Sequence, residues 1–193
     1  MKNTMKIAFA GILIALMFVL SWTVLGMIPL GPVSVTTVFI PVCIGIIFFD
    51  DLKYATIFGL FFGIASFVRS FVPNGLLDPY FQNPIVSVLP RLLVGILGYL
   101  IFKGLSKTIK SRVVISSITG GAVALLNTIL TMGTLILVYF SDISQLFADN
   151  GSSIRAVLAS IALVNMLPEI ALGVILTPVI IKVLDKLNNK NLE

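Results

Sequence analysis

Four polar residues, Arg91, Asn127, Asn165 and Glu169, stand inside long apolar stretches of the sequence, where polar groups mark sites of chemistry. An ionised carboxylate in hydrocarbon is costly unless it is neutralised, paired or wetted. Asn165 and Glu169 are four residues apart and share one face of a helix. Arg91 follows Pro90, which frees a backbone carbonyl and bends a helix. We therefore expect a polar cavity that holds a ligand, with interhelical hydrogen bonding as the alternative role of the two asparagines.

The composition restricts the class of protein that can place such residues. The chain has 193 residues, of which 58% are hydrophobic and 11% charged, and its mean hydropathy is +1.12. A soluble domain cannot bury so much apolar surface, so the sequence predicts an integral membrane protein. The absence of histidine excludes histidine-dependent catalysis, and the single Cys43 excludes an intrachain disulfide. We expect no metal site, no cofactor and no catalytic residue.

Hydropathy along the chain predicts an all-α membrane protein with six transmembrane helices in one integral membrane domain, residues 1–193. The expected helices are 6–28, 34–49, 54–72, 84–103, 113–140 and 154–184. The first apolar run is too long for the core of a signal peptide, so we expect it to remain as a helix. The second helix is short and contains Pro41, and we expect it to be tilted, broken or shielded by its neighbours.

The basic residues orient this bundle, because short loops rich in lysine and arginine stay on the cytoplasmic side. With both termini cytoplasmic, every lysine falls on that side. The basic residues there are Lys2, Lys6, Lys53, Lys103, Lys107, Lys110, Arg112, Lys182, Lys186 and Lys190. Arg69, Arg91 and Arg155 fall toward the outer ends of their helices, where they reach lipid headgroups or bind an anionic ligand. The net charge of +5 thus indicates a lipid bilayer, not nucleic acid, as the anionic partner.

Two further features involve residues outside this polar group. The loop between the first two helices is rich in proline and glycine and ends in Thr36 and Thr37, a pattern typical of an ordered lid whose hydroxyls cap the next helix or contact a ligand. Ala8, Gly11 and Ala15 form a small-residue stripe on the first helix. Such a stripe lets another helix approach closely, either within the chain or from a partner.

The sequence resembles a known family over almost its whole length. The matching features are the stripe and three stretches, "IPLGPVSVTTVFIPVCIG", "GLFFGIASFVRS" and "LPRLLVGILGYLIFKGL". They resemble the substrate-binding S component of an energy-coupling factor (ECF) vitamin transporter, and most closely its pantothenate-type branch. The resemblance implies a subunit in a prokaryotic cell membrane that captures a vitamin from outside.

The resemblance also implies partners. The S component docks on a transmembrane coupling protein, and two cytoplasmic ATPases power the cycle. The stripe Ala8, Gly11 and Ala15 matches the family's docking surface, although glycine partly replaces the usual alanine. The chain contains no Walker-type GxxxxGK[ST] motif, which agrees with ATP hydrolysis on partner subunits.

Pantothenate is a small anion with hydroxyls and an amide, so the pantothenate-type resemblance implies roles for individual residues. Arg91 would bind the carboxylate, Asn127, Asn165 and Glu169 the hydroxyls and amide, and Arg69 would be a further outer cation. Thr36 or Thr37 would contribute from the lid. If Glu169 instead neutralises Arg91, an uncharged or mixed-polarity vitamin would fit better.

Other functions remain open from the sequence. The substrate of an S component could be folate, cobalamin, riboflavin or a pyrimidine. An intramembrane enzyme with Glu169 and Arg91 as acid and electrostatic partner is a more distant alternative, and a structural membrane protein would not need the buried polar residues at all.

Overall fold

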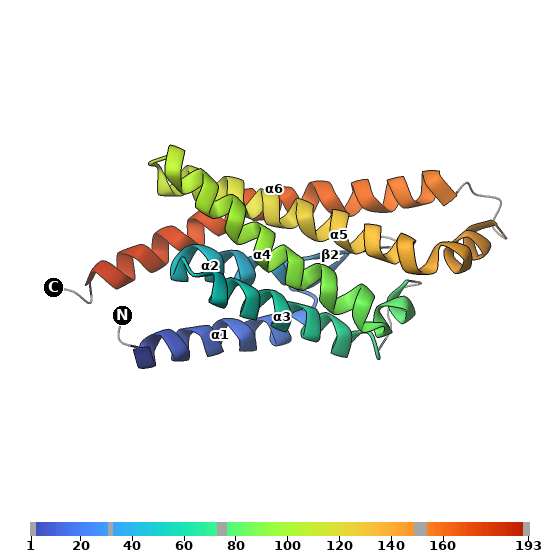
Figure 1. Cartoon of the computed structure of the whole chain (residues 1–193), viewed down its shortest axis with the longest axis horizontal. Helices are drawn as coiled ribbons and strands as arrows, with labels where there is room; N and C mark the ends of the chain where they lie inside the picture. The colour runs from blue at the N-terminus through green and yellow to red at the C-terminus, as the bar shows by residue number, and fades with distance from the viewer. Residues whose placement is uncertain (1–2, 31–32, 73–76, 149–153, 191–193) are drawn as a thin grey trace.

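The structure is an elongated helical bundle with one short β-hairpin (Figure 1). The computed structural model describes residues 3–30, 33–72, 77–148 and 154–190, without the side chains at 3, 29–30, 33–34, 146–148, 154–162 and 188–190. In chain order the elements are α1 (Asn3–Ser21), β1 (Met27–Leu30), β2 (Val33–Thr36), α2 (Phe39–Phe49), α3 (Leu52–Arg69), η1 (Asp78–Gln82), α4 (Pro84–Thr108), α5 (Arg112–Ala148) and α6 (Ile154–Lys190). We call the end where α1 begins and α6 ends the terminal end, and the opposite end the η1 end (Figure 1).

Five of the described helices, α1, α3, α4, α5 and α6, are long and apolar enough to cross a membrane. The predicted helical membrane bundle is therefore confirmed. Helix α2 has 11 residues, which span about 16 Å at about 1.5 Å per residue, roughly half of a hydrocarbon core. Its residues from Phe39 to Ile47 are buried, so its neighbours shield it as expected. The sixth crossing remains a prediction.

The largest difference from the predicted boundaries lies between α1 and α2. The helix expected over 6–28 ends at Ser21, and the helix expected over 34–49 begins only at Phe39. Residues Met27–Leu30 and Val33–Thr36 instead pair as antiparallel strands. Proline and glycine in this stretch interrupt helical hydrogen bonding, and its β-branched residues favour an extended backbone.

The other helix ends differ by smaller amounts. Helix α3 is shifted toward the N-terminus relative to 54–72, because Asp51 caps it by accepting a hydrogen bond from the Lys53 N–H. Helices α4, α5 and α6 run beyond 84–103, 113–140 and 154–184 into polar sequence. Hydropathy locates the apolar part of a helix and not its polar ends, so these extensions gave no hydropathy signal.

Small residues bring the helices of two pairs into close contact. A Cβ added at Gly95 of α4 would collide with the Ala55 carbonyl of α3, and one added at Gly120 of α5 would collide with the Gly173 carbonyl of α6. Close backbone approach of this kind stabilises helix pairs in a membrane, where no hydrophobic force acts between them. The α3–α4 and α5–α6 pairs thereby form a fixed frame, and α4 also packs on α5.

Candidate ligand-binding site

Glu169 lies in the buried part of α6, with only 2% of the residue exposed. Its Oε1 accepts a hydrogen bond from the backbone N–H of Thr36 at 2.9 Å, and its Oε2 accepts one from the Thr128 hydroxyl at 3.3 Å. Fixed donors from two segments, the β2 strand and α5, therefore replace the water that a carboxylate needs.

Arg91 is held at a similarly buried position on α4, with 7% exposure. Pro90 lacks the N–H that would bond to the Val86 carbonyl. The Nη1 of Arg91 donates to that carbonyl at 2.8 Å, which restores the missing hydrogen bond. The guanidinium lies 5.1 Å from the Phe81 ring centroid and 5.9 Å from that of Phe62, so two aromatic rings also stabilise the cation.

The two buried charges do not neutralise each other by direct pairing. Arg91 and Glu169 are near enough to interact electrostatically. Both side chains are described, and no salt bridge joins them. The Nε of Arg91 is buried without a hydrogen-bond partner. The Nε–H of this positively charged side chain is therefore available to donate to another acceptor.

Several buried acceptor and hydroxyl groups in this part of the bundle also lack partners. The Oδ1 atoms of Asn127 and Asn165 and the Oγ1 of Thr131 are buried without a described hydrogen bond. Thr131 is four residues after Asn127 on α5, and Asn165 is four residues before Glu169 on α6, so each pair shares a helix face. An unpaired buried polar atom costs about 1–3 kcal/mol. A polar ligand that supplies donors would remove these costs.

Three residues that lie at this site, Phe62, Thr128 and Thr131, are not among those predicted from the sequence. Helical spacing provides a signal for Thr131, because it lies on the Asn127 face. Thr128 and Phe62 have no comparable signal in the sequence, since their roles depend on how α5 meets α6 and how α3 meets α4.

The two lid threonines use their hydroxyls within the chain. The Oγ1 of Thr36 accepts from the Val38 N–H at 3.2 Å, just before α2, and the Thr37 hydroxyl donates to the Leu25 carbonyl at 2.8 Å. These contacts hold the loop before α2, whose N-cap residue Val38 makes no side-chain capping hydrogen bond, so the helix cap expected of the two hydroxyls is not observed. The link from this segment to the polar site is instead the Thr36 backbone N–H.

The remaining outer arginines have different surroundings. Arg69 ends α3, where its Nη1 donates to the Val72 carbonyl and its guanidinium lies 5.7 Å from the Trp22 ring centroid. These contacts are those of a residue at the rim of the bundle, where an arginine also reaches headgroups. The side chain of Arg155 lies outside the described residues.

The small-residue stripe on α1 lies on the surface. Ala8, Gly11 and Ala15 are all exposed, and a Cβ added at Gly11 would have no neighbour within 4 Å. Within the part of the chain that the structure describes, the stripe therefore does not pack another helix, and it leaves a smooth face toward the surroundings of the bundle.

Comparisons with known proteins bear on what this site binds. The sequence model of the family "ECF transporter, substrate-specific component" matches residues 5–181. The pantothenic acid transporter PanT of Lactococcus lactis subsp. cremoris (strain MG1363) is 29% identical over 174 residues, covering 83% of this chain and 82% of the relative.

Proposed function

The chain belongs to the family of ECF transporter substrate-specific components, and on that premise we propose that it captures pantothenate from outside the cell. Family membership makes it a subunit that selects a transporter's substrate, in place of the intramembrane-enzyme alternative. The choice of pantothenate rests on one observation above all, the buried Arg91 guanidinium whose Nε has no partner. The name of the PanT relative supports the same substrate.

Each group of pantothenate has a counterpart in this proposal. The ligand carboxylate accepts hydrogen bonds from the Nε edge of Arg91, while Nη1 stays on Val86. The ligand hydroxyls and amide N–H donate to the orphan oxygens of Asn127 and Asn165. Glu169 forms part of the wall beside them, and Arg69 and the Thr36–Thr37 segment belong to the outer rim and the lid.

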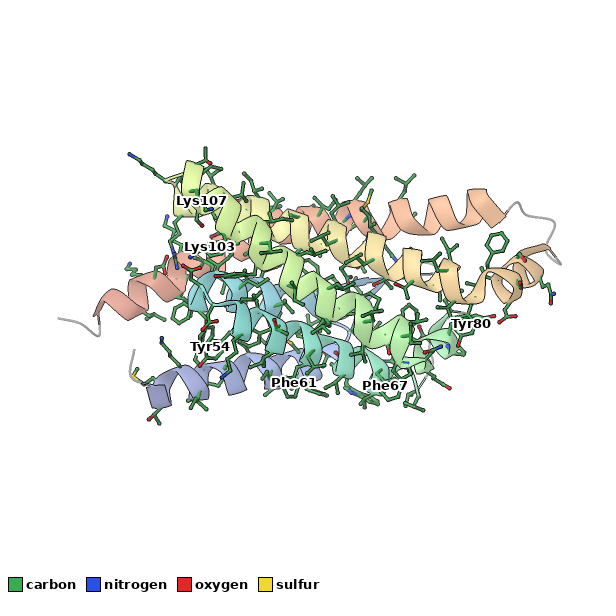
Figure 2. The ribbon with its side chains drawn as sticks, viewed as in Figure 1. Tyr54, Phe61, Phe67, Tyr80, Lys103 and Lys107 are labelled. Carbon is green, nitrogen blue, oxygen red and sulfur yellow. The ribbon has the colours of Figure 1, made fainter. Side chains whose placement is uncertain are left out.

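We propose that the terminal end is cytoplasmic and that the α2 segment completes a sixth crossing. Figure 2 places Lys103 and Lys107 near the terminal end and Tyr80 near the η1 end. Lys6 near the start of α1 and Lys182 near the end of α6 follow the same distribution. Basic residues gathered at one end support a cytoplasmic assignment, and aromatic residues are common at membrane interfaces.

We also propose that α1 docks on the transmembrane coupling protein of an ECF module in a prokaryotic cell membrane, with two cytoplasmic ATPases supplying the energy. The exposed stripe Ala8, Gly11 and Ala15 supports this role, because small residues allow a partner helix to pack closely. The surrounding residues on α1, including Ile7 and Ile12, are exposed and apolar, as a helix–helix contact in lipid requires.

The substrate proposal is tested by measuring the melting temperature of the purified protein with pantothenate and with other water-soluble vitamins. A free ligand at about 100 times its dissociation constant stabilises a protein by about 2.7 kcal/mol, so tight binding gives a clear increase. We expect pantothenate to give the largest increase. A larger shift with folate, cobalamin or riboflavin would replace pantothenate as the substrate, and the absence of any shift would contradict vitamin capture.

The docking proposal is tested by the substitution Gly11→Leu, with Gly104→Leu as a matched control. At either glycine an added Cβ has no neighbour within 4 Å among the described residues, so both substitutions begin in open space. We expect Gly11→Leu to abolish uptake in cells that express the full transporter, with vitamin affinity unchanged. Gly104→Leu should preserve both. Equal uptake by the two variants would contradict docking through the stripe.

A further inference from the structure

Thr36, the last residue of the β1–β2 hairpin, presents its backbone N–H to the bundle. The Thr37 N–H bonds to the Gly26 carbonyl at 2.9 Å, and Met27 pairs with Thr36 at the next position of the ladder. Bonded and non-bonded pairs alternate along an antiparallel ladder, so the Thr36 N–H faces away from β1. Inside a membrane protein, a backbone N–H outside a helix needs a hydrogen-bond acceptor within the protein.

The acceptor comes from a residue 133 positions later in the chain. Oε1 of Glu169 accepts the Thr36 N–H at 2.9 Å, while Oε2 accepts the Thr128 hydroxyl at 3.3 Å. One carboxylate therefore joins the hairpin to both α5 and α6. Strand β2 packs against α6 in the same region, and Val35, the neighbour of Thr36, is 1% exposed.

We propose that Glu169 is a positioning residue that latches the β1–β2 hairpin onto the α5–α6 pair. Its carboxylate holds the hairpin through a hydrogen bond to backbone, so the ligand is recognised chiefly by Arg91 and the two asparagines. The latch itself does not depend on the proposed function. A consequence for ligand exchange does rest on that function. If the hairpin covers the ligand, it must part from α6 when the ligand enters or leaves, and this hydrogen bond then breaks.

A cysteine reporter on the hairpin tests the latch without any ligand. Val35→Cys is introduced into a Cys43→Ala background, and the rate of maleimide labelling is measured in purified protein. The Val35 side chain is shielded while the hairpin is seated, so labelling reports how often it leaves the bundle. We expect Glu169→Ala to speed labelling on the order of tenfold, because the Thr36 N–H loses its buried acceptor.

Glu169→Gln is the matched variant, because its amide oxygen still accepts the Thr36 N–H but carries no charge. We expect it to label within about twofold of the parent protein, since the latch depends on the acceptor. Labelling as fast as in Glu169→Ala would show that charge matters instead, and an unchanged rate in Glu169→Ala would also overturn the proposal.

Thr128→Val provides a second route if Glu169→Ala does not fold. It removes the α5 anchor of the carboxylate while leaving Glu169 and the hairpin intact, and we expect labelling to rise about twofold to fivefold. No acceleration in this variant would overturn the three-way link. Pantothenate binding measured on the same parent protein separates the two proposals: loss of vitamin binding refutes the function, whereas the labelling rates alone decide the latch.

Discussion

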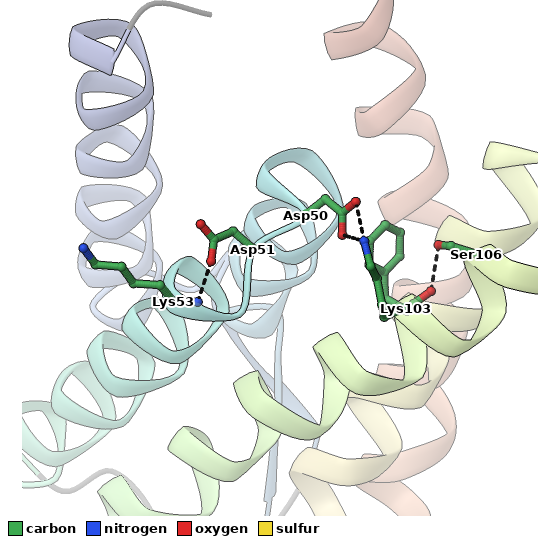
Figure 3. A network of polar contacts seen from close by, with 6 residues as sticks. Asp50, Asp51, Lys53, Lys103 and Ser106 are labelled. Atoms are coloured by element: carbon green, nitrogen blue, oxygen red, sulfur yellow. Dashed lines mark hydrogen bonds and ion pairs between the residues drawn. The ribbon is translucent and has the colours of Figure 1, made fainter.

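The charged residues of the buried site and those of the terminal end are stabilised in opposite ways. Lys103 and Asp50 form an ion pair at 2.8 Å, and about half of each side chain is exposed (Figure 3). Arg112 and Asp185 pair at 2.6 Å with similar exposure. Arg91 and Glu169 are almost fully buried, yet neutral hydrogen-bonding groups and aromatic rings hold them without a salt bridge.

This difference separates structural charges from charges available to a ligand. The Lys103–Asp50 pair ties the α2–α3 turn to α4, at a point where Asp50 adopts the left-handed conformation that ends α2. An exposed pair of this kind contributes about 0–1 kcal/mol. In the buried site, direct pairing of Arg91 with Glu169 would use up the donor edge that we propose for the ligand carboxylate. Because separate neutral groups hold each charge, the donor edge of Arg91 stays available.

The largest expected effect comes from Arg91→Ala. Removing one partner of a buried, hydrogen-bonded charge pair costs about 2–5 kcal/mol, which lowers affinity for pantothenate by about 30-fold or more. Isothermal titration calorimetry measures this change. Lys103→Ala, which removes an exposed cation, serves as the control and should bind like the parent protein. Similar losses in both variants would remove the distinction between the two regions.

A smaller effect is expected for Thr131→Val, which replaces a buried hydroxyl without a partner by a methyl group of similar size. We expect affinity to fall about fivefold to tenfold, while the free energy of unfolding stays unchanged or rises by up to about 1 kcal/mol. Calorimetry and thermal unfolding measure the two quantities.

Thr134→Val is the matched control on the same helix, because the Thr134 hydroxyl already donates to the Leu130 carbonyl at 2.8 Å. It should leave affinity unchanged. Unaltered affinity in Thr131→Val as well would exclude its hydroxyl from the ligand site.

The smallest effect is expected for Lys103→Met, which removes one exposed ion pair. The free energy of unfolding should fall by no more than about 1 kcal/mol, or about 2–4 °C in melting temperature. This loss should vanish in 1 M salt, where the Debye length is about 3 Å. Thermal unfolding at low and high salt checks it. A larger, salt-independent loss would mean that this pair behaves as a buried one.

The parts of the site that follow from local chemistry could be predicted from the sequence. Pro90 frees a carbonyl next to Arg91 on the same helix, and the arginine now bonds that carbonyl. The partners of Glu169 could not be predicted in this way. They come from the hairpin and α5, and their approach depends on how separate segments pack, so the sequence left open whether Glu169 pairs with Arg91 or contacts the ligand.

The same reasoning applies to the fold. Long apolar runs predicted the helices well, because each run can cross the bilayer independently of the others. The hairpin gives no hydropathy signal of its own, because its apolar residues extend the signals of both neighbouring helices. Hydropathy therefore assigns Met27 and Ser34 to helices, whereas the structure places them in strands. The pairing of β2 with β1 and its packing on α6 supply partners for an extended backbone at this position, and neither can be read from the hydropathy of a single segment.

The central claim, that Arg91 recognises a ligand carboxylate, is tested most directly by a double comparison in the calorimeter. Pantothenate and its neutral analogue, in which a hydroxymethyl group replaces the carboxylate, are titrated into the parent protein and into Arg91→Gln. We predict that the parent protein prefers pantothenate by at least about tenfold, or about 1.4 kcal/mol, and that Arg91→Gln loses this preference. An equal preference in both proteins would contradict the assignment of Arg91 to the carboxylate.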